Sequence, residues 1–126
     1  MTLENLINFI DFYTDNGTIS PHKPWGEEIS IKENGVNLVR SLRANDWLAL
    51  YQKLGKKSDF WIECLIDLLD LVGTRKARQM IVHIALNGTE KNFFDGMKCI
   101  GEFRRNVDVY TWLKLKNRAS EISKHS

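Results

Sequence analysis

Two segments of the chain carry the same pattern 33 residues apart. In each, a glycine precedes polar residues and an aromatic pair: Gly55 precedes Phe60-Trp61, Gly88 precedes Phe93-Phe94, and 88 − 55 = 33. Repeats of about 20 to 50 residues, with a helix breaker before each aromatic-led helix, are typical of stacked helical hairpins. We therefore expect a layered helical array, an architecture that more often provides a binding surface than a catalytic cleft.

Two Gly-Thr pairs indicate how tightly the later helices are joined. Gly73-Thr74 and Gly88-Thr89 each follow an apolar pattern with helical spacing. Glycine can take the left-handed conformation that ends a helix, and threonine can cap the next helix at once. Because so short a junction places consecutive helices side by side and antiparallel, the sequence predicts an all-α stack of hairpins.

The chain of 126 residues has the length of a single domain. Apolar residues at helical spacing predict a first helix over residues 1–15 and a helical-hairpin stack over residues 36–120, about six to seven helices in all. Between them, residues 16–35 contain both prolines and several Asn-Gly and Ser-Pro pairs. We therefore expect an irregular N-terminal loop over residues 16–35.

Composition excludes a disordered or membrane-spanning chain. The hydrophobic share of 43% and the charged share of 27% are those of an ordinary globular protein. The longest apolar run, residues 61–72, is interrupted by three acids, and no secretory signal is visible at the start of the chain. Cys64 and Cys99 lie in apolar helical patterns, which favours buried free thiols in a reducing compartment. We expect a cytoplasmic protein with no membrane partner.

No catalytic or cofactor-binding pattern is evident in the sequence. The three histidines have no metal-ligand spacing to each other or to a cysteine, and no nucleophile, phosphate-loop or dinucleotide motif occurs. Asp67 and Asp70 could act as paired carboxylates, but acids on a helix surface are far commoner. We therefore expect a protein that is not an enzyme and that uses no cofactor, metal or small-molecule substrate.

The predicted helix over residues 58–72 carries a row of acids. Asp59, Glu63, Asp67 and Asp70 recur at intervals of four, four and three residues. This spacing places them on one face of the helix. Such a face suits a basic protein partner and can accelerate its association. The alternative is a solvated helix surface without a partner. We assign partner binding to these four acids.

Charge is also divided along the chain. Residues 1–73 hold 7 basic and 11 acidic residues, 7 − 11 = −4, and residues 74–126 hold 11 and 5, 11 − 5 = +6. The two halves can thereby orient a charged partner. Within the predicted loop, Trp25 lies beside Glu27 and Glu28 and is a candidate aromatic anchor for the same partner.

The basic half supports an alternative hypothesis, a helical-repeat protein that binds nucleic acid. Phosphate binding requires several cations on one surface, which a helical stack can provide. Glu90, Asp95, Glu102 and Asp108 interrupt the same region and argue against this function. The candidate residues are Arg75, Arg78, Arg104, Arg105 and Lys114.

The paired helices with Gly-Thr junctions and repeated aromatic pairs resemble short HEAT-like α-solenoids over residues 35–118. The small helical domain, with its Leu-Ile-Asp-Leu-Leu segment at residues 65–69, also resembles the immunity proteins of bacterial polymorphic-toxin and contact-dependent growth-inhibition systems. The resemblance implies a toxin inhibitor that binds a cognate toxin domain, often a nuclease, and occludes its functional surface. This chain departs from the simplest such protein because its net charge is +2 rather than strongly negative.

Overall fold

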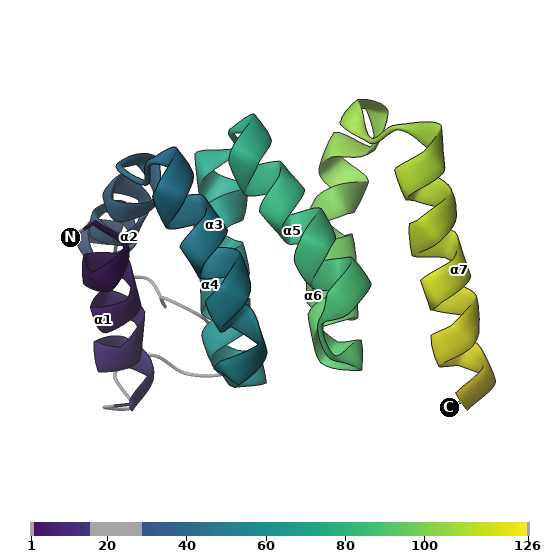
Figure 1. Cartoon of the computed structure of the whole chain (residues 1–126), viewed down its shortest axis with the longest axis horizontal. Coiled ribbons are helices and arrows are strands. Elements are labelled where there is room, and N and C mark those ends of the chain that lie inside the picture. Colours follow the sequence, from purple (N-terminus) through teal and green to yellow (C-terminus); the bar gives the residue numbers. More distant parts are fainter. Residues whose placement is uncertain (1, 16–28, 126) are drawn as a thin grey trace.

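The computed structural model of the chain describes residues 2–15 and 29–125, which form a row of seven α-helices with no strand in these two ranges (Figure 1). The predicted all-α fold and the predicted number of helices are therefore confirmed. The helices are α1 (Thr2–Asp15), α2 (Ile29–Arg40), α3 (Ala44–Lys53), α4 (Asp59–Val72), α5 (Arg75–Asn87), α6 (Glu90–Ile100) and α7 (Val109–His125), with the short 3-10 helices η1 (Leu54–Lys56) and η2 (Gly101–Asn106).

The helices pack in two layers with α4 at the centre. In one layer α4 lies between α2 and α6, and in the other α1 contacts α3 and α5 contacts α7. Across the layers α4 also packs against α1 and α5, so it is enclosed on most sides. The two ends of the chain lie at opposite ends of the row (Figure 1). The buried residues of α4 are Trp61, Ile62, Cys64, Leu65, Ile66, Leu68 and Leu69.

Local capping explains where α4, α5 and α6 begin. The side-chain oxygens of Ser58, Thr74 and Thr89 each accept a hydrogen bond from the backbone N–H three residues further on, at 3.1, 3.3 and 3.2 Å. These bonds satisfy N–H groups that have no partner inside the helix. Gly73 ends α4 in the left-handed conformation, with φ 65°. The predicted junction at Gly73-Thr74 is confirmed.

Gly88 ends α5 in a different way from the one predicted. Its backbone is extended, with φ −83° and ψ −166°, rather than left-handed. A Cβ at this position would lie 2.6 Å from Asn92 Oδ1 and 2.8 Å from the carbonyl oxygen of Ile84. Glycine is therefore required here by the close approach of the start of α6 and not by its backbone angles.

The predicted loop over residues 16–35 is wrong in its second part. Residues 29–35 belong to α2, so the stack begins before residue 36, whereas residues 16–28 lie outside the described residues. Asn34-Gly35 is a turn signal in the sequence, but Gly35 is buried where an added Cβ would lie 2.9 Å from both Leu68 Cδ2 and Phe9 Cε1. Packing against α1 and α4 therefore overrides the low helix propensity of glycine.

The 33-residue offset does not align the two aromatic pairs within their helices. The aromatic pair begins two residues after the N-cap Ser58 in α4, but four residues after the N-cap Thr89 in α6. Two residues turn a side chain by about 200° around a helix, so the pairs face in different directions. Trp61 is 3% exposed, whereas its counterpart Phe94 is 50% exposed.

Candidate functional site

The four acids predicted on one helix face lie along α4 where it borders α2 and α6. We call Asp59, Glu63, Asp67 and Asp70 the α4 acidic face; all four are half-buried. They are half-buried because α2 and α6 flank α4 in the same layer. The structure therefore places them in one row, as their spacing predicts, but partly between helices rather than on an open surface.

Two members of the α4 acidic face already hold α6 in place. Asp59 Oδ1 accepts a hydrogen bond of 2.8 Å from the Thr89 hydroxyl, and Glu63 forms an ion pair with Lys91. Lys91 also pairs with Asp95 at 2.8 Å. Charge-assisted hydrogen bonds of this kind are among the stronger polar contacts. Asp59 and Glu63 therefore help to hold α6 in place. The carboxylates at this point outnumber the cation, since Glu63 and Asp95 both pair with Lys91.

Asp67 is poorly compensated within the fold. Its buried Oδ2 accepts no hydrogen bond from any residue the structure describes, and the nearest cation, Lys32 Nζ, is 3.9 Å away. Burial raises the pKa of Asp67, Lys32 opposes this rise, and the nearby carboxylates of Asp70 and Glu63 add to it. The side chain still remains 36% exposed. The Oδ2 atom is buried, so a further cation can reach Asp67 only at the exposed part of its side chain.

The two cysteines are poor nucleophiles. Burial, followed by the carboxylates of Asp70, Glu102 and Asp67, raises the pKa of Cys99 to about 12. Burial likewise raises the pKa of Cys64 to about 12, with smaller contributions from neighbouring acids. Both are free thiols, as predicted, although Cys99 is only half-buried. Because the thiolate is the reactive form, neither cysteine is suited to nucleophilic catalysis.

His83 packs against an aromatic ring in the described structure. Its ring centroid lies 4.6 Å from that of Tyr51 in an edge-to-face contact, and burial lowers the pKa of His83. No group of three or more His, Cys, Asp or Glu within residues 2–15 and 29–125 is placed to hold a metal ion. In the same part of the chain, no helix has both the length and the apolar character needed to cross a bilayer.

The pH dependence of stability tests the position of Asp67. Because its folded pKa lies above the ordinary value of 3.8, the folded state binds this proton more tightly, and stability falls as pH rises between the two values. Asp67→Asn cannot ionise, so we expect it to be more stable than the parent near pH 7 and to lose this advantage near pH 3.5. Urea unfolding followed by circular dichroism at several pH values measures the difference.

The matched control for this experiment is Asp15→Asn, which changes an exposed carboxylate on α1. We expect the gain in stability near pH 7 relative to pH 3.5 to be larger for Asp67→Asn than for this control. An Asp67→Asn variant that is less stable than the parent near pH 7 would show that the attraction of Lys32 outweighs the cost of burial.

The aromatic anchor and its two acids, Trp25, Glu27 and Glu28, lie outside the described residues. Their part in partner binding stays a prediction.

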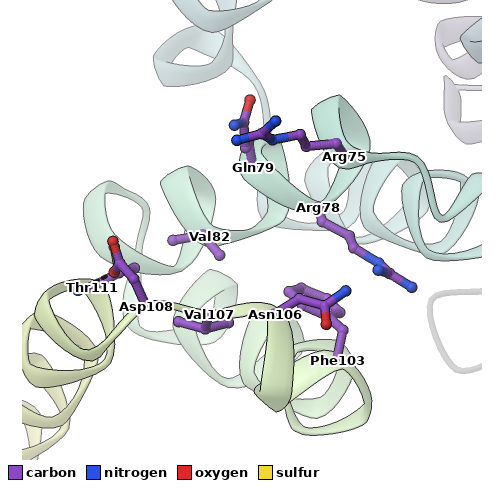
Figure 2. A pocket seen from close by; sticks show the side chains of 9 residues that line it. All are labelled: Arg75, Arg78, Gln79, Val82, Phe103, Asn106, Val107, Asp108 and Thr111. Carbon is purple, nitrogen blue, oxygen red and sulfur yellow. Dashed lines mark hydrogen bonds between the residues drawn. The ribbon is translucent and has the colours of Figure 1, made fainter.

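The five basic residues of the alternative hypothesis lie on three elements, α5, η2 and α7. Arg75 and Arg78 line a cleft between α5, η2 and the start of α7 (Figure 2). Arg104 stacks on the Trp112 ring at 4.8 Å, Lys114 stacks on the Tyr110 ring at 4.5 Å, and Arg105 is exposed.

Two groups of surface residues were missed by the sequence interpretation. The first is the neutral lining of the cleft, such as Asn106 and Thr111, which no motif marks. The second is the exposed apolar set on α7, where Val109 and Tyr110 are 77% and 68% exposed and Leu113 is also exposed. A signal for the second was present, since apolar residues cover more of this helix than a single core-facing stripe requires.

Comparison of the chain with protein-family models, with curated proteins and with solved structures finds no match in any of the three.

Proposed function

We propose that this chain is an immunity protein that binds a cognate bacterial toxin domain in the cytoplasm and blocks it by occlusion. In this proposal the α4 acidic face receives basic side chains of the toxin, as the phosphate-binding cleft of a nuclease would present. The small all-α fold agrees with the resemblance noted in the sequence. The mechanism requires no reaction on the part of this chain.

The observation that carries the proposal is the state of Asp67. A buried carboxylate oxygen without a donor, beside Asp70 and Glu63, costs stability in the isolated chain. Residues that cost stability are expected where function requires them. A guanidinium from a partner would bind at the exposed part of the Asp67 side chain and offset the repulsion among the carboxylates, while the buried Oδ2 stays out of its reach.

The cations beside the α4 acidic face support the same proposal, that this face receives a basic partner. Lys32 and Lys91 are already paired with carboxylates of the chain. They therefore neutralise the α4 acidic face only in part. Asp59 and Asp70 also belong to this face, and Asp95 shares Lys91 with Glu63. A net negative surface of this kind steers a basic partner and increases its association rate.

Co-expression with a toxin domain tests the proposal. If the neighbouring upstream gene encodes a large secreted protein with a variable C-terminal domain, that domain is the probe; otherwise the probe is the protein that co-purifies with the tagged chain. We expect the chain to protect growth and to form a stable one-to-one complex with the probe. Absence of both protection and complex formation would overturn the proposed function.

Variants locate the interface separately from the function. We expect Asp67→Asn with Asp70→Asn to weaken the complex by about tenfold or more, because charged interfacial contacts typically contribute more than 1.4 kcal/mol. The control, Asp15→Asn with Glu121→Gln, changes the net charge equally at exposed positions away from α4. Equal affinities for the two double variants would remove the α4 acidic face as the interface while leaving the function intact.

A further inference from the structure

A cleft of about 590 Å³ lies between α5, η2 and the start of α7, on helices that do not contribute to the α4 acidic face. We call it the α5–α7 cleft. Small-molecule and cofactor sites commonly have volumes of about 300 to 1,000 Å³, so this cleft can accept more than a single inorganic ion. Its lining is Arg75, Arg78, Gln79, Val82, Phe103, Asn106, Val107, Asp108 and Thr111 (Figure 2).

Two arginines bring uncompensated positive charge to the α5–α7 cleft. Arg75 and Arg78 occupy the first turn of α5, where the helix dipole adds to their charge. Neither forms an ion pair with a carboxylate of the described residues, in contrast to Lys32 and Lys91. Arg78 stacks on the Phe103 ring at 5.2 Å, which holds its guanidinium without using its hydrogen bonds.

The remainder of the cleft is mixed: Val82 and Val107 are apolar, Gln79, Asn106 and Thr111 are polar, and Asp108 provides a hydrogen-bond acceptor. In Figure 2, Val82 and Val107 lie between Arg78 on one side and Asp108 and Thr111 on the other. The Asp108 carboxylate accepts a 2.7 Å hydrogen bond from the Thr111 backbone N–H. Hydrogen bonds from Thr111 lower the pKa of Asp108, so the carboxylate is ionised at neutral pH. A ligand seated here meets cations, two valines and an acceptor in that order.

We propose that the α5–α7 cleft binds a nucleotide, with its phosphate on Arg75 and Arg78 and its base over Val82 and Val107. The forked guanidinium groups match phosphate oxygens in a bidentate manner once both side chains, which point apart in Figure 2, turn toward the bound phosphate. A flat base covers Val82 and Val107, and an exocyclic amino group can donate to Asp108. An acidic peptide would satisfy the arginines and its backbone N–H groups could donate to Asp108, but poly-glutamate has no flat ring to cover the two valines.

The nucleotide can be free or part of a single-stranded nucleic acid, and the probes distinguish these sources. Calorimetry with AMP, UMP, inorganic phosphate and a poly-glutamate peptide is combined with fluorescence anisotropy of a labelled oligoadenylate at low salt. We expect AMP to bind at least tenfold more tightly than phosphate or the peptide. An oligoadenylate that binds more than tenfold tighter than AMP indicates the polymer as the source, and equal affinities indicate the free nucleotide.

Replacement of the two arginines tests the phosphate-binding end of the α5–α7 cleft. We expect Arg75→Gln with Arg78→Gln to weaken AMP binding by tenfold or more for each lost charged hydrogen bond. Lys116→Gln with Lys124→Gln makes the same change in net charge at exposed α7 positions and should alter affinity less than twofold. Arg75→Gln alone leaves the stacking of Arg78 on Phe103 intact, so it keeps the test valid if the double variant unfolds.

Asp108→Asn tests the base end of the cleft. Asparagine also caps helices well, so α7 should keep its start. We expect this variant to weaken AMP binding about threefold relative to UMP, which has no exocyclic amino group, because a charged acceptor is replaced by a neutral one. The proposal is overturned if AMP and oligoadenylate fail to bind, if the arginine variants bind as well as the parent, or if phosphate or peptide binds as tightly as AMP.

Discussion

Replacement of Leu68 by alanine is expected to lower the free energy of unfolding by about 2 to 5 kcal/mol. Leu68 is fully buried in α4, the helix that contacts α1, α2, α5 and α6. A cavity at this point removes contacts to more than one helix, and the enclosed site cannot collapse easily. Since small domains have only about 5 to 15 kcal/mol of stability, urea unfolding followed by circular dichroism will show a large loss.

Gly35 provides the internal control for the Leu68 experiment. In the parent, a Cβ on Gly35 would lie 2.9 Å from Leu68 Cδ2, so Gly35→Ala should destabilise the protein. Leu68→Ala removes the close contacts with Leu68, although Phe9 Cε1 at 2.9 Å must still shift, and alanine gains about 0.5 to 1 kcal/mol over glycine inside a helix. We therefore expect Gly35→Ala to cost less stability in the Leu68→Ala background than in the parent, a coupling that a double-mutant cycle measures. Strictly additive effects would contradict the packing of α2 on α4 described above.

Arg118→Met is expected to loosen α7 from the stack and to cost about 2 to 3 kcal/mol. Arg118 Nη1 donates a 2.9 Å hydrogen bond to the Ala85 carbonyl, and Nη2 donates to the Gly88 carbonyl. These carbonyls belong to the end of α5, where a helix leaves acceptors unsatisfied. The guanidinium also lies over the Phe93 ring at 5.8 Å. Methionine keeps apolar length but provides no donor.

The effect of Arg118→Met should be largest in α7, because Leu115 is the only fully buried side chain among those of α7 that the structure describes. Hydrogen exchange of α7 amides measures the loosening directly. Lys114→Met is the matched control, since Lys114 also lies on α7 and its Nζ lies over the Tyr110 ring. Equal exchange of α7 amides in both variants would mean that apolar packing alone holds α7.

The two proposed binding regions can be tested independently. The α4 acidic face depends on α4 carboxylates, whereas the α5–α7 cleft depends on Arg75 and Arg78. A variant of the α4 acidic face is expected to lose the toxin complex and still bind AMP. A variant of Arg75 and Arg78 is expected to lose AMP binding and still form the toxin complex. No charged residue belongs to both regions.

Helix starts were predictable because capping is a local interaction. Ser58, Thr74 and Thr89 each bond to a backbone N–H only three residues away, so short sequence windows contain the whole signal. The start of α2 was not predictable in this way. In the sequence alone, Gly35 indicates a turn. Its place in a helix depends on the side chains of Leu68 and Phe9, which come from other helices and pack against it.

The candidate site was likewise predictable where its signal is local and not where it depends on distant residues. The spacing of Asp59, Glu63, Asp67 and Asp70 was sufficient to align them on one helix face. Their partners could not be predicted, because Thr89 and Lys91 lie 30 and 28 residues further along the chain from the acids they bind. The α5–α7 cleft was also beyond prediction, since two separate segments of the chain, residues 75–82 and 103–111, line it.

The sequence by itself determined the all-α class, the caps of the later helices and the alignment of the four acids. Only the tertiary structure decided that Asp59 and Glu63 are used to hold α6 while Asp67 is left without a donor. The physical reason is that helical periodicity sets the direction of a side chain about its own axis. The group that meets the side chain depends on how the neighbouring helix packs, which residues distant in the sequence decide.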